Sequence, residues 1–411
     1  MHTDVLIIGG GASGLAACAA LADSGLRITL AERLDRVGKK ILSTGNGRCN
    51  LSNEDMNPDY YGDAAPFVRK LYRETPPQEV LSFFERLGLM TAREDSRIYP
   101  RTMAAASVLD VLRACIENER VTLLTGRQVV SLSRSRRGGW SASLDSGEGV
   151  FAQWVIFAAG GCAAPSMGTD GSGYAMLASL GHDITPRYPA LVQLKCDHRA
   201  LKSLKGVRIQ AGLTLEIAGQ HAAQENGELL FADYGVSGVC IFQLSRHVAK
   251  AIEEKKPVRL LVNLLPEIPQ EDLDGWLSRR IALRPDASAQ SLLTGVFHRL
   301  LAQAVLREAG ISPEEKAADL CAEEQAALLR CVHSFVLPVA GTQGFAQAQV
   351  TRGGVTLSDV DPATMASRIY GDLYITGEAL DVDGPCGGYN LHFAFAGGLT
   401  AAKTIRSQLV F

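Results

Sequence analysis

The sequence lacks most features of a secreted, membrane-bound or nucleic-acid-binding protein. Its nine cysteines are odd in number and no two are spaced as CxxC, which argues against a disulfide framework, a zinc site and a dithiol redox pair. No apolar run is long enough to span a membrane. A formal net charge of −3 gives no general attraction to nucleic acid or anionic lipid. We therefore expect no metal site, no nucleic-acid partner and no membrane partner.

Aromatic residues are also scarce, at 6%, but apolar residues make up 46% of the chain, enough for a sizeable core. The first strand is expected almost at the first residue, without a basic start or a cleavage site, so no signal peptide is expected. Together with the unpaired cysteines, this favours a cytoplasmic location. A length of 411 residues exceeds one ordinary domain and predicts two or three units.

The most informative segment is the N-terminal one. A short apolar run, residues 5–8, predicts a buried parallel strand, and Gly9, Gly11 and Gly14 then form a GxGxxG turn that opens a helix. Glu32 ends the next predicted strand, 18 residues past Gly14, where a ribose-binding carboxylate belongs. A glycine turn that only packs a βαβ unit is the alternative, but strand, turn, helix and acid together favour a dinucleotide site. Ala12, Ser13 and Arg33 complete this predicted site.

A second glycine-rich loop, residues 38–50, follows the acid by a few positions. Its lysines and arginine offer positive charge, and its glycines expose backbone N–H groups, so it is suited to hold phosphate or to cover a flat ring. A solvated basic turn is the alternative. The predicted binding residues here are Lys39, Lys40, Ser43, Gly45, Gly47, Arg48, Cys49 and Asn50.

The third element lies near the C-terminus, in residues 372–391. A buried strand is predicted to end at Gly377-Glu378, and Gly387-Gly388 to open a helix near Tyr389. The positive end of that helix would stabilise an electron-rich ring such as a reduced flavin. Acids near Gly377 suit a ribityl chain, although alone this segment is equally consistent with an ordinary turn. The predicted contacts are Gly377, Glu378, Asp381, Gly388, Tyr389, Asn390 and Leu391, with Gly160 from the Gly-Gly pair after an earlier strand.

The alternation of strands and helices stops near residue 188 and resumes near 350. Between them lie β-rich segments, with strands expected at 192–195, 207–217, 229–231, 239–244 and 259–264, and then helical periodicity. This predicts an α/β domain at 1–187 and 351–411, split by a β-rich substrate domain at 188–268 and 333–350. A helical subdomain is expected at 269–332.

These motifs resemble those of the two-dinucleotide-binding flavoproteins, and more narrowly of the BaiN-like, aminoacetone-oxidase-like family of bacterial flavoproteins. The matching stretches are GRCNLSN (47–53), GELLFADYGVSG (227–238), VTRGGVTL (350–357) and TGEALDVDGPCGGYNL (376–391). The resemblance implies a Rossmann-like FAD-binding domain split by a β-barrel-like insertion that carries a small helical bundle. It also implies noncovalent FAD, with adenosine on Glu32, pyrophosphate on residues 9–14, and flavin between the GRCN loop and the GGYN helix. Val129 is implied to contact the adenine through its backbone.

The chain departs from this family pattern at one point. Relatives carry Thr-His after the GELLF string and Pro after the SG pair, whereas this chain has Ala232-Asp233 and Val239. The substrate of a relative therefore does not by itself indicate the substrate of this chain.

The leading functional hypothesis is an NAD(P)H-driven, FAD-dependent reductase of an activated C=C bond in a small hydrophobic enone, possibly steroid-like or bile-acid-like. Because no second GxGxxG fingerprint is present, NAD(P)H is expected to bind only transiently. Two alternatives stay open: an amine or aminoketone oxidase that uses oxygen, and a flavin-bearing RNA-modification factor. Tyr389 and Cys49 are the candidate catalytic residues. The oligomeric state is not predicted.

Overall fold

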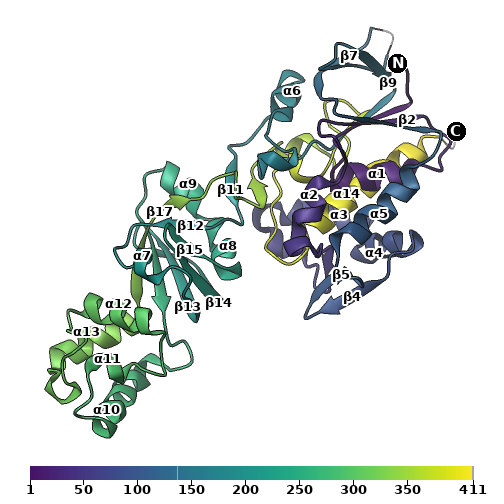
Figure 1. Cartoon of the computed structure of the whole chain (residues 1–411). Coiled ribbons are helices and arrows are strands. Elements are labelled where there is room, and N and C mark those ends of the chain that lie inside the picture. Colours follow the sequence, from purple (N-terminus) through teal and green to yellow (C-terminus); the bar gives the residue numbers. More distant parts are fainter. Residues whose placement is uncertain (137, 410–411) are drawn as a thin grey trace. The chain divides into compact units, whose positions relative to one another are not determined.

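The computed structural model describes residues 1–136 and 138–409, and the chain forms two compact units. Unit 1 combines Met1–Pro189 with Gln349–Phe411, and unit 2 is the intervening Ala190–Ala348. Each unit encloses a hydrophobic core of its own. The chain therefore leaves the first unit and returns to it, as the violet-to-yellow colouring of Figure 1 shows.

Unit 1 is built on a five-stranded parallel sheet with the strand order β19-β10-β1-β2-β6. Four of the strands are buried at every position, because helices and loops cover both faces, and this explains their continuous apolar runs. The C-terminal strand β19 pairs with β10, so the last part of the chain joins the same sheet as the first. The strands are β1 (Val5–Ile8), β2 (Ile28–Glu32), β6 (Val121–Thr125), β10 (Trp154–Phe157) and β19 (Leu373–Ile375).

Helices pack around this sheet, and the two at its centre are α1 and α14 (Figure 1). A Cβ atom added at Gly398 of α14 would lie 2.2 Å from the Ser13 carbonyl oxygen of α1, so the two helices approach at backbone distance. The helices of this unit are α1 (Ala12–Leu21), α2 (Lys39–Ser43), α3 (Ala65–Glu74), α4 (Pro77–Arg86), α5 (Ala105–Ile116), α6 (Gly173–Ser179) and α14 (Tyr389–Ser407).

Small sheets complete the first unit. The strands β3 (Ser52–Asn53), β5 (Arg97–Pro100) and β4 (Thr91–Glu94) form one antiparallel sheet. A second consists of β7 (Val129–Arg134), β8 (Trp140–Leu144) and β9 (Gly149–Ala152). The short strands β11 (Tyr188–Ala190) and β18 (Val350–Arg352) pair with each other.

Unit 2 contains a closed barrel with the strand order β12-β15-β14-β13-β16-β17. Its strands are β12 (Leu194–Cys196), β13 (Arg208–Ile217), β14 (Gln220–Ala232), β15 (Gly235–Ser237), β16 (Val258–Asn263) and β17 (Phe335–Thr342). The helices of the unit are α7 (Leu201–Leu204), α8 (Val239–Ser245), α9 (Val248–Glu253), α10 (Leu273–Leu283), α11 (Ala289–Leu292), α12 (Arg299–Ala309) and α13 (Ala322–His333). The predicted fold class, a split Rossmann-like domain with a barrel-like insertion, is confirmed.

One predicted strand of the insertion is wrong. Residues 239–244 form helix α8 instead of a strand. Cys240, Ile241 and Leu244 are buried while Val239 is half exposed, which is the spacing of one helix face. A short apolar run is compatible with either structure, so only packing against β14 decides between them.

The close approach of α1 and α14 yields a stability prediction. Gly398→Ala should lower the free energy of unfolding by about 1–3 kcal/mol, because its methyl group would collide with the Ser13 carbonyl. A loss of stability would indicate this collision, because replacing glycine with alanine inside a helix otherwise stabilises the protein by about 1 kcal/mol.

Urea unfolding followed by circular dichroism measures this difference. Gly371→Ala is the control in the same unit, because no heavy atom of the described residues lies within 4 Å of its added Cβ. An unchanged midpoint for Gly398→Ala would show that the two helices separate easily.

Candidate cofactor site at the carboxyl edge of the parallel sheet

Four loops meet at one edge of the five-stranded sheet. Because parallel strands share the direction of their carboxyl ends, the residues that follow β1, β2, β10 and β19 emerge at the same edge. These loops carry the glycines after β1, Glu32, the Gly160-Gly161 pair and Gly377-Glu378. The sheet topology thus brings together the first motif, Gly160 and the C-terminal segment, although they are far apart in the sequence.

Two glycines of the first turn allow close backbone packing, and the third leaves an open position. A Cβ at Gly9 would lie 2.5 Å from the Ala158 carbonyl oxygen, and one at Gly14 would lie 2.0 Å from the Gly9 carbonyl oxygen. At Gly11, by contrast, no heavy atom of residues 1–136 or 138–409 lies within 4 Å of an added Cβ. Backbone therefore packs tightly on both sides of an open position at the N-terminus of α1, where Ala12 begins the helix. This geometry fits a pyrophosphate.

Glu32 holds the first turn in place. Its buried carboxylate accepts hydrogen bonds from the Gly10 N–H at 2.9 Å and from the Leu34 N–H at 2.8 Å. The next residue, Arg33, forms an ion pair with Asp170. The acid therefore lies at the sheet edge and orders the loop that would face a dinucleotide.

The second loop has an unusual backbone. Gly45, Asn46, Gly47 and Cys49 all have φ between +55° and +82°. Left-handed backbone is tolerated by asparagine but costly for cysteine, and such strain is concentrated at binding sites. Within the described residues, the buried Asn50 Oδ1 atom has no hydrogen-bond partner. An orphaned acceptor beside a strained loop fits a bound cofactor that supplies the missing donor.

Two of the three cations of this loop, Lys40 and Arg48, form ion pairs within the protein. The Arg48 guanidinium forms an ion pair with Glu94 at 2.6 Å and lies over the Tyr99 ring, 4.7 Å from its centroid. Arg48 is thus engaged with strands β4 and β5. Lys39 is the first residue of α2 and is half-buried, and the Ser43 hydroxyl donates to the Lys40 carbonyl.

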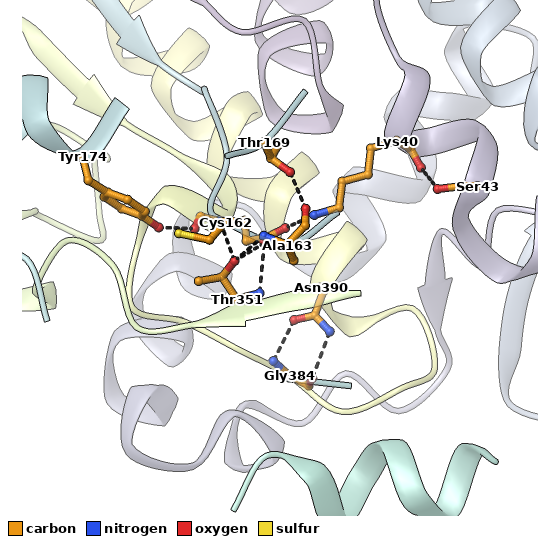
Figure 2. A network of polar contacts seen from close by, with 10 residues as sticks. Lys40, Ser43, Cys162, Ala163, Thr169, Tyr174, Thr351, Gly384 and Asn390 are labelled. Atoms are coloured by element: carbon orange, nitrogen blue, oxygen red, sulfur yellow. Dashed lines mark hydrogen bonds and ion pairs between the residues drawn. The ribbon is translucent and has the colours of Figure 1, made fainter. Parts of the chain in front are cut away.

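Lys40 instead belongs to a polar network with Thr351 and Cys162 (Figure 2), and Glu378 joins its members. Its Nζ lies 2.7 Å from Glu378 Oε2, and Glu378 Oε1 accepts hydrogen bonds from the Thr351 hydroxyl at 2.8 Å and the Thr351 N–H at 3.0 Å. The Thr351 hydroxyl in turn accepts from the N–H groups of Cys162 and Ala163. One carboxylate therefore joins three segments that are far apart in the sequence.

Several members of this network carry no sequence motif by themselves. Thr351 lies inside the VTRGGVTL stretch, which offered the only signal for it. The Tyr174 hydroxyl donates to the Glu378 carbonyl, and Thr169 donates to the Ala163 carbonyl. A Cβ at Gly161 would lie 2.4 Å from the Thr351 hydroxyl oxygen, so the Gly-Gly pair after β10 is needed for this packing.

The C-terminal loop is held by its own polar side chains. The Asn390 side chain accepts from the Gly384 N–H at 2.8 Å and donates to the Gly384 carbonyl at 2.9 Å (Figure 2). The Asp381 carboxylate accepts from the Thr185 hydroxyl. These two residues shape the loop in the structure. Their predicted contact with a cofactor stays a prediction.

Of the remaining predicted residues, three lie at or beside α14 and Val129 lies in β7. Gly377 packs against Ser13, since its added Cβ would lie 2.7 Å from the Ser13 hydroxyl oxygen. Gly388 caps α14 and Leu391 lies half-buried in its first turn. Val129 begins β7 opposite Leu144 and is buried.

The two candidate catalytic side chains are kept in their neutral forms. Burial, with a smaller contribution from Tyr60 and Asp55, raises the pKa of Tyr389 to about 12. Burial raises the pKa of the Cys49 thiol to about 11, and its side chain is fully enclosed in the core. The Tyr389 hydroxyl is therefore protonated at neutral pH and can donate a proton. Cys49 is a protonated core residue and a poor nucleophile.

The described residues contain no cluster of three or more His, Cys, Asp or Glu side chains arranged for a metal ion. None of their helices combines the length and apolarity that crossing a bilayer demands.

Comparison with known proteins agrees with this geometry. A family model described as HI0933-like protein Rossmann domain matches residues 3–404. The chain belongs to this family. This HI0933-like protein is 40% identical over 400 residues to the 3-dehydro-bile acid delta(4,6)-reductase of Clostridium scindens, with 97% of each chain covered. It is 26% identical over 407 residues to the ribosomal RNA dihydrouridine synthase of Escherichia coli, with 98% of each chain covered.

Solved structures show the same fold. A 3-ketosteroid delta1-dehydrogenase from Sterolibacterium denitrificans matches this HI0933-like protein with a TM-score of 0.53 at 14% identity, covering 99% of this chain and 100% of that one. The family resemblance inferred from the motifs is confirmed. The protein is an FAD-dependent oxidoreductase, as the sequence predicted.

The position of Glu32 yields a prediction about cofactor affinity. Glu32→Ala should weaken FAD binding by about 10- to 100-fold, because a charge-assisted acceptor is worth about 1.5–3 kcal/mol. The loss has two sources: the hydrogen bonds to Gly10 and Leu34, and the expected bond to a ribose hydroxyl.

Quenching of FAD fluorescence during titration of the apoprotein measures this affinity. Asp35→Ala, which removes an exposed acid three positions away, is the matched control and should leave affinity within about twofold. Full affinity in Glu32→Ala would contradict both contributions, the ordering of the turn and the bond to the ribose.

Proposed function

We propose that this protein reduces a C=C bond conjugated to a carbonyl group in a steroid-like small molecule, with noncovalently bound FAD and with NAD(P)H as the electron donor. The observation that carries the proposal is the 40% identity, over 97% of both chains, to a 3-dehydro-bile acid delta(4,6)-reductase. A relative of that similarity and coverage supports a shared reaction more strongly than the fold alone.

The more distant relatives support the same reaction class. Dihydrouridine differs from uridine by saturation of the ring C=C bond next to a carbonyl, and a 4,6-dien-3-one likewise has alkenes conjugated to a ketone. The two named activities, in relatives at 40% and 26% identity, thus both reduce a C=C bond that is conjugated to a carbonyl group. In each, an electron-poor β-carbon accepts hydride and the adjacent α-carbon then needs a proton.

The carboxyl edge of the sheet provides positions for each part of FAD. The open position at Gly11 and the N-terminus of α1 would hold the pyrophosphate, and Glu32 the adenosine ribose. The strained loop 45–50 and the N-terminus of α14 would flank the flavin ring. When bound and reduced by NAD(P)H, the flavin of FAD would supply the hydride that the electron-poor alkene carbon receives.

The chain itself contributes electrostatics and a proton. The helix dipole of α14, 19 residues long, places partial positive charge where electron density increases on the ring. Tyr389 is the first residue of that helix, and its raised pKa keeps the hydroxyl protonated. We assign Tyr389 as the donor of the proton to the α-carbon, and we assign Cys49 no catalytic step.

NAD(P)H has no dedicated domain within residues 1–136 and 138–409. The described part of the chain contains one five-stranded parallel sheet, and the GxGxxG turn of that sheet is the one assigned to FAD. We therefore propose that NAD(P)H and the substrate reach the flavin in turn, which gives ping-pong kinetics.

A second candidate, reduction of uridine in ribosomal RNA, is favoured by the relatives named for that activity. Their identity to this chain is 26% and 25%, well below that of the bile-acid reductase. The formal net charge of −3 also gives no general attraction for a polyanion. The small-molecule proposal is therefore the first to test.

The decisive experiment separates the two substrates. The FAD-loaded protein is reduced with NADH or NADPH under nitrogen and then mixed with a 3-oxo-4,6-diene steroid, its saturated 3-oxo counterpart, or unmodified ribosomal RNA. We expect the dienone alone to restore the yellow colour and to yield a product two hydrogens heavier. Reoxidation by RNA and not by dienone would establish the second candidate. Reoxidation by oxygen alone would contradict both.

The proton-donor assignment yields its own prediction. Tyr389→Phe should slow steady-state turnover by about 100-fold, the usual size of a general-acid contribution, while reduction of the flavin by NAD(P)H stays unchanged. Tyr60→Phe is the control, because its ring contacts Tyr389 while its own hydroxyl is bound to Asp55.

The pH dependence follows from the sign of the shift. Because the pKa of Tyr389 is raised, its donor form persists as pH increases and is lost only near about pH 12. Activity of the wild type should show no loss from this group between pH 7 and about pH 10. Equal turnover in Tyr389→Phe and wild type would assign the proton to water instead.

A further inference from the structure

The two segments proposed to flank the flavin are hydrogen-bonded directly to each other. Ser52, two residues after Asn50, lies with its hydroxyl oxygen 2.8 Å from Nδ1 of His392, in the first turn of α14. Both side chains are fully buried, and 340 positions of sequence separate them. Nothing in the proposed chemistry uses this pair.

Further contacts join the same two segments. The Asn53 side chain donates to the Gly387 carbonyl at 2.9 Å. A Cβ at Gly388 would lie 2.4 Å from the Ser52 carbonyl oxygen and 2.8 Å from Asn50 Oδ1. The loop and the start of the helix therefore meet at backbone distance, and the Ser52–His392 bond fixes how they align.

The histidine ring is held without a charge. Complete burial lowers the pKa of His392 to about 3, so the imidazole is neutral in any ordinary buffer. Its Nε2 atom has no hydrogen-bond partner within the described residues, and the ring meets the Tyr72 ring nearly at right angles at 5.5 Å. An apolar side chain of similar size would avoid the unpaired nitrogen, so the bond made by Nδ1 is what the imidazole contributes.

Two tyrosines also contact the N-terminal turn of α14. The Tyr61 hydroxyl donates to the Tyr389 carbonyl at 2.9 Å and is hydrogen-bonded to the Tyr72 hydroxyl at 2.7 Å. Tyr72 in turn contacts the His392 ring. The first turn of α14 is thus held both by a tyrosine hydroxyl and by Ser52.

We propose that His392 is a positioning residue for the flavin. Through Ser52 it sets the alignment of the 45–50 loop against the N-terminus of α14, and thereby the distance between the helix dipole and the flavin ring. This inference rests on the proposed placement of the flavin between these two segments. It requires no knowledge of the substrate.

The test compares Ser52→Ala, His392→Leu, the double variant and His392→Asn. Because an asparagine amide places a polar atom near the position of Nδ1, His392→Asn should retain the bond to Ser52. Each of the first two variants should bind FAD about 3- to 10-fold more weakly, the range expected for one buried hydrogen bond. The double variant should bind FAD as tightly as the single variant with the lower affinity. His392→Asn should recover most of the wild-type affinity.

The readouts are the FAD dissociation constant, the visible absorption bands of the bound flavin and its reduction potential. We expect Ser52→Ala and His392→Leu to shift the bands and the potential in the same direction. Thr400→Val is the matched control, because it removes a buried hydrogen bond to Thr75 from the same helix, two turns further on. It should lower the unfolding midpoint and leave the flavin spectrum unchanged.

The outcomes are separable from those for the proposed function. If Ser52→Ala and His392→Leu lower the unfolding midpoint as Thr400→Val does, yet leave affinity, spectrum and potential unchanged, the pair is structural only and this inference is overturned. Additive losses in the double variant would overturn it too. A wild-type protein that binds no FAD would overturn the placement of the cofactor itself, whereas failure to reduce any dienone would leave this inference standing.

Discussion

The packing of the two ends of the chain around Ser13 is the constraint on which the site depends. An added Cβ at Gly377 would lie 2.7 Å from the Ser13 hydroxyl oxygen, and one at Gly398 would lie 2.2 Å from the Ser13 carbonyl oxygen. Only glycine permits this approach at both positions. It seats strand β19 beside β10 and helix α14 beside α1, so that the C-terminal loop reaches the edge formed by the N-terminal turn.

Charge at this edge is balanced within the protein. Lys40 is paired with Glu378 and Arg48 with Glu94, while burial keeps Tyr389, Cys49 and His392 in their neutral forms. The positive potential for an anionic cofactor then comes from backbone, namely the N-termini of α1 and α14 and the left-handed loop. Backbone groups can therefore attract an anionic cofactor although Lys40 and Arg48 are already paired with acids of the protein.

The sequence predicted the parts of the molecule whose structure is decided locally. Buried parallel strands appear as unbroken apolar runs, so β1 and β10 were readable, and the spacing from Gly14 to Glu32 follows from the length of one helix and one strand. The glycine-rich loop was also recognised from its composition, whereas the left-handed backbone of Asn46 and Cys49 was not predicted. Together with the family resemblance of the longer motifs, these patterns led to the fold class, the cofactor and the enzyme class without coordinates.

Tertiary structure decided what depends on partners distant in the chain. The apolar run 239–245 is a helix because of what it packs against, and the same letters are compatible with a strand. Lys40 looked like a phosphate anchor, yet its nearest anion is Glu378, 338 positions away. Thr351 and Ser52 lie in stretches that resemble the family, but nothing near them or near His392 in the sequence indicates their partners, because a hydrogen bond between segments leaves no pattern in either one. The sequence by itself determined the strands, the turn and the acid, since each depends on near neighbours. The return of the chain to unit 1 decided which side chains meet at the sheet edge.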